Sequence, residues 1–133
     1  MTLRVPTDLV GCQVWRISFD YQVRLTLVAR HPDEGFSVDA ELVIEVPFRL
    51  RDATGEWHEL DPGSGVTLAP ALGLFQMTIT TLAVGETGGL TLGFDSGAEL
   101  VVVPHPQFEA WSLTGHGVHD VTIGPGGERD WQR

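Results

Sequence analysis

The sequence predicts a mainly β fold: an antiparallel meander, a sandwich or an open barrel of about seven to nine strands, with one short helix near residues 67–74. The clearest reason is an unbroken alternation of apolar and polar residues from Phe36 to Leu50. Shorter alternating segments elsewhere are separated by glycine- and proline-rich turns at fairly even spacing. No repeat or linker divides the chain, so residues 1–133 are expected to form a single domain with loosely ordered ends at 1–8 and 126–133.

The first two strands are expected to form a hairpin. Apolar and polar residues alternate within residues 13–19 and again within residues 23–27, and a tight turn fits between them. Trp15 belongs to the apolar set of the first strand, so its side chain is expected in the core. Cys12, just before that strand, is expected to be a small buried residue.

The strongest signal is the long alternating segment. Its apolar residues share one parity, which only an extended chain gathers on one face: Phe36, Val38, Ala40, Leu42, Ile44, Val46, Phe48 and Leu50. At about 3.3 Å per residue the segment would be roughly 50 Å long, so we expect it to bend. Pro47 marks the place, because proline cannot donate to a strand ladder and is confined to edges and bulges.

The residues that follow change character. Residues 51–65 are rich in turn formers and leave room for a short strand near residues 56–60. The helix near residues 67–74 is expected to have Thr67 as its cap, Pro70 in its first turn and Gly73 at its end.

Further strands complete the predicted sheets. They are expected near residues 76–84, 90–94, 100–103, 108–113 and 118–123. The last two would pair around Gly115 and Gly117. Trp111 lies in an apolar strand pattern and is expected in the core, and Trp131 is expected to fold back onto it.

Composition excludes several classes of function. The chain has a formal net charge of −10, which disfavours nucleic-acid binding and favours a basic partner. Its single cysteine cannot form an intrachain disulfide, and no segment approaches the roughly 20 apolar residues that span a bilayer. We therefore expect a cytoplasmic protein that binds neither nucleic acid nor membrane. The absence of lysine and asparagine is typical of a GC-rich bacterial genome.

Catalytic motifs are missing from the sequence. It contains no glycine-rich phosphate loop, and Ser64 lacks the spacing of a nucleophile elbow, so neither an enzyme activity nor a cofactor is expected. The residues with the chemistry to bind a metal are His105, His116, His119 and Asp120. A strand would point His116 and His119 to opposite faces, so structural roles are favoured for them.

Acidic residues gather in two neighbouring segments. Asp39, Glu41 and Glu45 share the polar face of the long strand, and Asp52, Glu56, Glu59 and Asp61 crowd the loop after it. Trp57 lies among the second set, and exposed aromatic residues often anchor interfaces. A solvated strand face is no catalytic cleft, so these residues are the predicted partner-binding surface.

Several short structural motifs are distributed along the chain from about residue 9 to its end. They are Leu9-Val10-Gly11-Cys12, residues 20–25, residues 41–45 with Pro47-Phe48, residues 68–74, residues 90–92 with Phe94-Asp95, residues 108–111 with 113–115, and Gly126-Gly127-Glu128. Together they resemble a family of small uncharacterised actinobacterial proteins. The closing W-x-L-x-G pattern is also similar to immunity proteins encoded beside polymorphic toxins. The resemblance implies a family without assigning an activity.

Four functions follow as hypotheses. The favoured one is a non-catalytic binding protein of the immunity type, which masks a basic toxin through an acidic face. The second is a small-molecule-binding β barrel lined by tryptophans. The third is an enzyme or metalloprotein that uses the histidines, and the fourth is a homodimeric structural protein that pairs exposed sheet edges.

Overall fold

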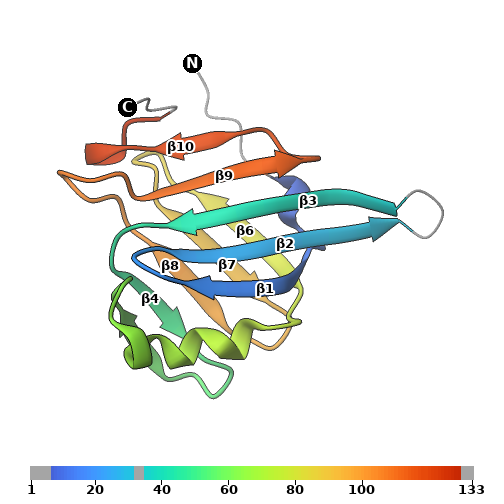
Figure 1. Ribbon diagram of the computed structural model, residues 1–133, viewed down its shortest axis with the longest axis horizontal. Coiled ribbons are helices and arrows are strands. Elements are labelled where there is room, and N and C mark those ends of the chain that lie inside the picture. Colours follow the sequence, from blue (N-terminus) through green and yellow to red (C-terminus); the bar gives the residue numbers. More distant parts are fainter. Residues whose placement is uncertain (1–6, 32–34, 130–133) are drawn as a thin grey trace.

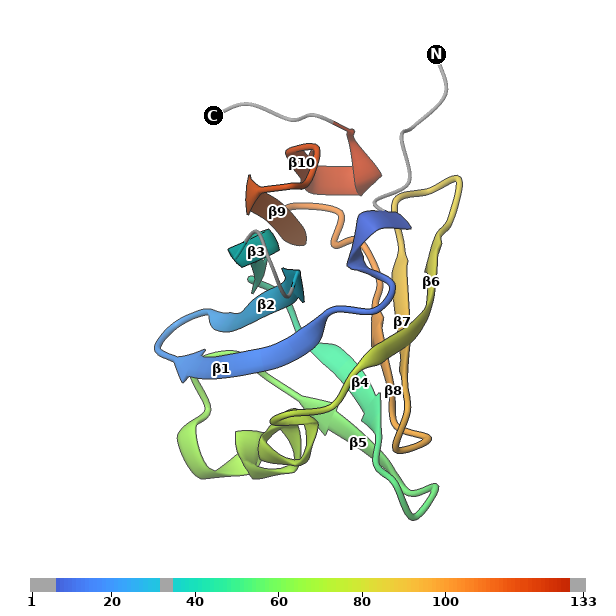
Figure 2. The same cartoon turned by 90° about the vertical axis from the view of Figure 1, so that its right-hand side faces the viewer.

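The computed structural model describes residues 7–31 and 35–129. Two five-stranded antiparallel sheets pack face to face as a sandwich (Figures 1 and 2). Sheet A has the order β1 (Gln13–Phe19), β2 (Val23–His31), β3 (Gly35–Ile44), β9 (Trp111–His116) and β10 (Val121–Ile123). Sheet B has the order β5 (Trp57–Leu60), β4 (Phe48–Arg51), β8 (Glu99–Val102), β7 (Leu90–Phe94) and β6 (Ile79–Val84). In the described part of the chain the two sheets do not close into a barrel. Of the architectures expected from the sequence, the protein therefore has the sandwich.

The alternating segment supplies one strand to each sheet. β3 ends at Ile44 and β4 begins at Phe48, so the predicted bend is a corner between the sheets. Because the segment forms two strands, the described residues contain ten strands, compared with the expected seven to nine. The interior parity continues around the corner, since Ile44, Val46 and Phe48 are all buried.

Pro47 lies in this corner and not in a strand. β3 pairs with β2 and β9, and β4 pairs with β5 and β8, so both strands are internal. The bend predicted at Pro47 is therefore present, but Pro47 lies neither in an edge strand nor in a β-bulge of the described ladders. Proline has no N–H to donate to a strand ladder. It is accommodated in a corner between two sheets because no ladder hydrogen bond is needed there.

The prediction that Trp15 lies in the core is wrong. Val14 stands opposite Leu27 and Arg16 stands opposite Thr26, so Trp15 is the extra residue of a β-bulge. Val14 is fully buried, whereas the Trp15 side chain is 51 % exposed. The bulge moves the tryptophan out of the interior phase of the strand.

The expected helix is present as the 3₁₀ helix η2 (Gly65–Leu74). Leu68, Ala71 and Leu74 are its buried residues, and Pro70 lies within it. Thr67 is not the cap, because the helix begins two residues earlier and its N-cap, Ser64, makes no side-chain capping bond. The helix also continues past Gly73, which the sequence analysis placed at its end.

η2 runs along the outer edge of β1 (Figure 1). Before the helix, a Cβ on Gly63 would lie 3.5 Å from the Tyr21 ring, beyond the end of β1. After it, Gln76 N–H donates to the Val14 carbonyl at 2.9 Å. Ten residues of 3₁₀ helix span roughly 20 Å, close to the length of a seven-residue strand, so η2 covers this sheet edge.

One continuous core fills the space between the sheets. Trp111 is fully buried, as predicted, and its Nε1 donates to the Gly88 carbonyl at 2.8 Å. Cys12 is also buried, as predicted, and burial, with a smaller effect from Asp8, raises the pKa of its thiol to about 11. The thiol is therefore protonated and packed as an apolar group.

The chain ends with a shorter hairpin than predicted. β9 runs from Trp111 to His116, three residues later than predicted, so it includes Gly115, which was expected in the turn; β10 is the shortened strand and begins at Val121. Within the segments expected to be loosely ordered, η1 (Thr7–Leu9) and η3 (Pro125–Gly127) form. Trp131 lies outside the described residues. Among the residues that the structure describes, no helix is long and apolar enough to cross a membrane.

Candidate functional site

The predicted partner-binding residues belong to two different sheets: one set lies on β3 and its end in sheet A, and the other lies on and around β5 in sheet B (Figure 2). Asp39, Glu41 and Glu45 alternate with the buried residues of β3 and its end, so they face away from sheet B. Trp57 and Glu59 lie on the outer side of β5, Asp52 and Glu56 lie in the turn between β4 and β5, and Asp61 follows β5. The structure therefore does not bring them together as one acidic surface.

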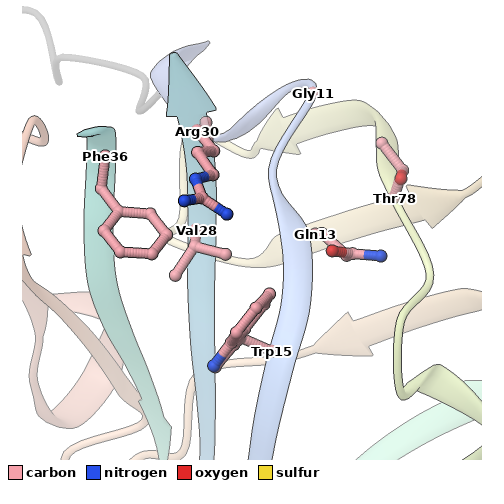
Figure 3. Close-up of a pocket in the computed structure, with 8 residues that line it drawn as sticks. Gly11, Gln13, Trp15, Val28, Arg30, Phe36 and Thr78 are labelled. Atoms are coloured by element: carbon pink, nitrogen blue, oxygen red, sulfur yellow. The ribbon is translucent and has the colours of Figure 1, made fainter. Parts of the chain in front are cut away.

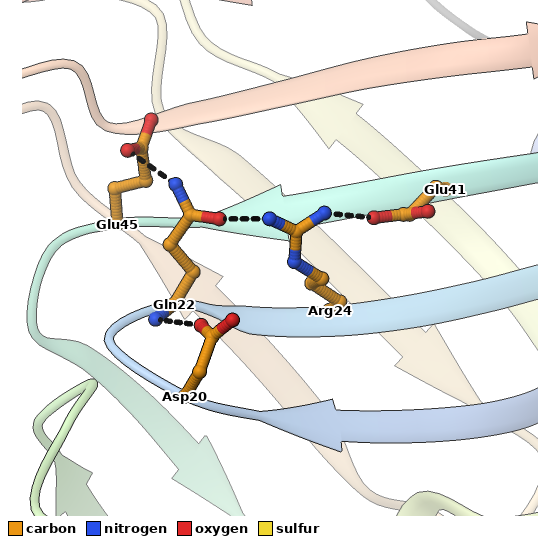
Figure 4. Close-up of polar contacts among 5 residues, drawn as sticks. All are labelled: Asp20, Gln22, Arg24, Glu41 and Glu45. Carbon is orange, nitrogen blue, oxygen red and sulfur yellow. Dashed lines mark hydrogen bonds and ion pairs between the residues drawn. The ribbon is translucent and has the colours of Figure 1, made fainter.

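A chain of hydrogen bonds holds two of the acidic residues on sheet A (Figure 4). Arg24 Nη1 donates to Glu41 Oε1 at 2.8 Å, and Arg24 Nη2 donates to Gln22 Oε1 at 2.5 Å. Gln22 Nε2 then donates to Glu45 Oε1 at 2.7 Å. Among the described residues Asp39 forms no ion pair, so it is the carboxylate of this strand face with the fewest internal partners.

Asp52 organises the turn between β4 and β5. Its Oδ1 accepts hydrogen bonds from the Thr54 and Glu56 backbone N–H groups at 2.9 and 3.1 Å, and its Oδ2 lies 2.8 Å from His58 Nε2. The bond with His58, followed by the Thr54 hydroxyl, holds the pKa of Asp52 well below its usual range. Asp52 is thus a charged residue that stabilises the turn.

Asp52, Glu56 and His58 also have ligand atoms within 4.8 Å of one another. In the described ranges this is the group whose side chains meet closely enough to hold a metal ion. The contacts of Asp52 are nevertheless internal to the turn, which gives the cluster a structural explanation.

Trp57 packs on two arginines of the neighbouring strand. The Arg49 guanidinium carbon lies 4.5 Å from the centroid of its ring, and the Arg51 carbon lies 5.7 Å away. Each arginine also pairs with a glutamate, Arg49 with Glu59 at 3.7 Å and Arg51 with Glu99 at 3.4 Å. Trp57 is 41 % exposed, but cationic groups from its own sheet already lie against its ring.

Within residues 7–31 and 35–129, the four residues considered as metal ligands do not form a close group, in line with the structural roles favoured for them: His105, His116, His119 and Asp120. His105 stacks on Phe108 with 4.8 Å between ring centroids. His116 ends β9 opposite Asp39 in β3, and the other two lie in the exposed turn before β10.

Trp15 forms one wall of a groove on the outer face of sheet A (Figure 3). Phe36 stands beside it, with ring centroids 6.3 Å apart and planes at 74°. Arg30 lies over the Phe36 ring at 5.8 Å, and Val28 lies beneath the aromatic side chains. The groove has a volume of about 490 Å³ and is open to solvent.

The other side of Trp15 borders a second, smaller hollow of about 280 Å³, which we call the slot. Its lining is Gln13, Trp15, Phe75 and Gln76. Phe75 is 49 % exposed, and Gln76 has a φ of +66°, the single positive φ outside glycine among the described residues. Gln13 Nε2 donates to the Gln76 carbonyl at 3.1 Å and joins the two walls.

The Trp15 groove is not among the sites predicted from the sequence. The available signal is the pair Val14-Trp15, because two adjacent apolar residues cannot both face the core from a regular strand. The β-bulge lets Val14 and Ile17 both face the core while Trp15 points out, and bulges are frequent beside functional sites. The three tryptophans that the structure describes do not line a common cavity: Trp111 is in the core, while Trp15 and Trp57 lie on opposite outer faces.

Comparisons with known proteins place the chain in a family. Searches among curated proteins and among solved structures gave no match. A family model does match residues 5–132, which is nearly the whole chain. The predicted membership of an uncharacterised family is therefore confirmed, whereas the actinobacterial origin and the similarity to immunity proteins stay predictions. The chain belongs to DUF6188, a family of unknown function.

Proposed function

We propose that this protein is a non-catalytic binding protein that recognises a basic partner protein through the outer face of sheet A. In its cellular role it acts as an immunity-type protein, which covers a toxin and blocks access to it. The observation that carries this proposal is the Trp15 groove, an exposed aromatic surface on a strongly acidic protein.

The aromatic residues supply the first support. Trp15, Phe36 and Phe75 are 51 %, 40 % and 49 % exposed and lie around the groove and the slot. Tryptophan is among the residues that most often dominate binding energy when an interface desolvates it. In the unbound protein this apolar surface remains in water, and a partner that covers it gains the free energy of burial.

Charge supplies the second support. The net charge of −10 attracts basic proteins over long range and raises the rate of encounter. Asp39 lies on β3 opposite Val28, which lines the Trp15 groove. A basic surface laid on sheet A would therefore meet the groove and a carboxylate together.

A growth-rescue experiment tests the proposal. The protein is co-expressed in a bacterial host with the product of the adjacent gene, under a promoter that makes this product toxic. We expect the wild-type protein to restore growth and the Trp15→Ala variant to fail. Trp57→Ala is the matched control, because it removes an equally large exposed ring from the opposite face.

Folding is checked by circular dichroism and thermal melting of all three proteins. A folded Trp15→Ala variant that rescues as well as the wild type overturns the proposed surface. An adjacent product without toxicity, or toxicity that the wild-type protein does not relieve, overturns the immunity-type role.

A further inference from the structure

We infer that the partner inserts one uncharged apolar side chain into the slot between Trp15 and Phe75, and places a positive charge over Asp39, which lies two strands away from Trp15. This inference rests on the proposed function and adds the chemistry of the contact. It defines the partner as a basic surface whose anchor residue is itself apolar.

The lining of the slot argues for an apolar anchor. Two aromatic rings form its walls, and both glutamines are uncharged. Its volume of about 280 Å³ lies below the roughly 300–1,000 Å³ of most small-molecule sites, so a single side chain suits it better than a whole ligand. The Gln13 amide group already donates to the Gln76 backbone carbonyl, and the two rings are the large apolar surfaces of the slot.

Neighbouring charges disfavour a cationic anchor. Arg16 follows Trp15 directly in β1, and Arg30 lies over the Phe36 ring on the other side of Trp15. A lysine or arginine inserted beside Trp15 would enter a region that already holds these two positive groups. An uncharged side chain avoids this repulsion and still gains from burial against the rings.

The carboxylates that would meet a basic surface lie two strands away. β3 is separated from β1 by β2, and strands in a sheet are about 4.8 Å apart, so β3 is roughly 10 Å from Trp15. Glu41 is paired with Arg24, and Glu45 accepts from Gln22. Asp39 has no ion pair with the described residues, which makes it the carboxylate that a partner's cation would meet.

A short extended peptide tests this arrangement. In an extended chain, side chains four residues apart lie on the same face and are separated by roughly 13 Å, so the probe is acetyl-Leu-Gly-Ser-Gly-Arg-amide. The readouts are the indole N–H signal of Trp15 and the amide signal of Asp39 in ¹H–¹⁵N spectra, with the Trp57 indole as an internal control. The Trp15→Ala and Trp57→Ala variants assign the two indole signals.

We expect the peptide to shift the Trp15 and Asp39 signals and to leave Trp57 unchanged. Replacing the peptide leucine by glycine is expected to weaken binding at least about tenfold, because the buried apolar surface is lost. Replacing its arginine by glutamate is expected to weaken binding about fivefold, as for a solvent-exposed ion pair. Phe75→Ser, which removes the second wall, should abolish the Trp15 shift without touching the bulge.

Three results overturn the inference. If the peptide shifts Asp39 but not Trp15, the slot is not an anchor site, while the proposed basic partner survives. If the glutamate peptide binds the slot as tightly as the arginine peptide, the requirement for a basic partner fails as well. If the Trp15 signal moves with protein concentration alone, a second copy of this chain occupies the slot.

Discussion

The two exposed tryptophans of the sandwich differ in what surrounds them. Trp15 on sheet A is 51 % exposed and borders two open hollows. Trp57 on sheet B is 41 % exposed, but two arginines of the adjacent strand lie against its ring. Similar exposure therefore corresponds to an open surface in one case and to an internally partnered residue in the other.

The local backbone differs in the same way. Trp57 stands in regular register with Arg51, so its ring lies over the side chains of β4. Trp15 is the extra residue of a bulge, and the strained Gln76 lies next to it in the slot. Regular pairing covers an aromatic ring with neighbouring side chains, whereas a bulge leaves the ring facing solvent.

The largest expected effect is on the rate at which the partner dissociates, which should depend on Trp15 and not on Trp57. With the partner identified by growth rescue, Trp15→Ala should raise the dissociation rate by about 30-fold, because a buried aromatic anchor is lost. Asp39→Asn should instead lower the association rate by a few-fold at low salt, since it removes a steering charge. Biolayer interferometry at two ionic strengths measures both rates.

Trp57→Ala is the control in this measurement and should leave both rates within about twofold of the wild type. A Trp57→Ala variant that dissociates as fast as Trp15→Ala would show that both outer faces contact the partner. The comparison between the two tryptophans would then fail.

For the free energy of unfolding, the Trp57 substitution should have a larger effect than the Trp15 substitution, the opposite of their effects on binding. Trp57→Ala removes contacts with two guanidinium groups, each worth about 0.5–1 kcal/mol at an exposed site, so the free energy of unfolding should fall by about 1–2 kcal/mol. Trp15→Ala loses an edge contact with Phe36 and should cost less. Urea denaturation followed by circular dichroism gives both values, and equal losses would contradict the difference in packing.

Gln76 gives a smaller effect with the opposite sign. A side chain at positive φ costs about 1 kcal/mol, and glycine is the residue that normally occupies this conformation after a helix. Gln76→Gly should therefore raise the free energy of unfolding by up to about 1 kcal/mol, measured by urea denaturation. It should also weaken binding of the apolar-anchored peptide, because one side of the slot is removed. Unchanged stability would mean that the glutamine side chain offsets the strain.

The sequence was sufficient to predict most of the fold because alternation directly records which side of a strand is buried. The parity from Val38 to Leu50 holds across the corner between the sheets, and β1 has the predicted bounds. The corner itself was predicted as a bend. The internal positions of β3 and β4 in their sheets were not predicted, because the strands beside them come from distant segments of the chain.

The candidate site was harder to predict because it depends on irregular backbone. A single extra residue in β1 reverses the orientation of Trp15, and only the adjacent apolar pair Val14-Trp15 marks it in the sequence. Phe36 reaches the groove from β3, and Phe75 reaches the slot from the residue after η2, and these segments are distant in sequence. The sequence also does not show which acidic residues are available to a partner, since the ion pair of Glu41 with Arg24 is visible only in the structure.

The smallest expected effect concerns pH and the turn that carries Trp57. The pKa of Asp52 is lower in the folded protein than in the unfolded chain, so its contacts stabilise the fold above about pH 4 and lose this effect as the pH falls below that value. The effect should be modest, because the Asp52 side chain is 28 % exposed and solvent screens its charge.

Asp52→Asn should therefore be less stable than the wild type near neutral pH, and the difference should shrink on acidification to about pH 3. Thr54→Val, which removes the hydroxyl donor to Asp52, should show a smaller difference with the same trend. Urea denaturation across this pH range measures the trend, and a difference that stays constant would mean that the charge of Asp52 does not stabilise the turn. Because the turn joins β4 to β5, this loss should loosen the surroundings of Trp57 and leave the Trp15 groove unchanged.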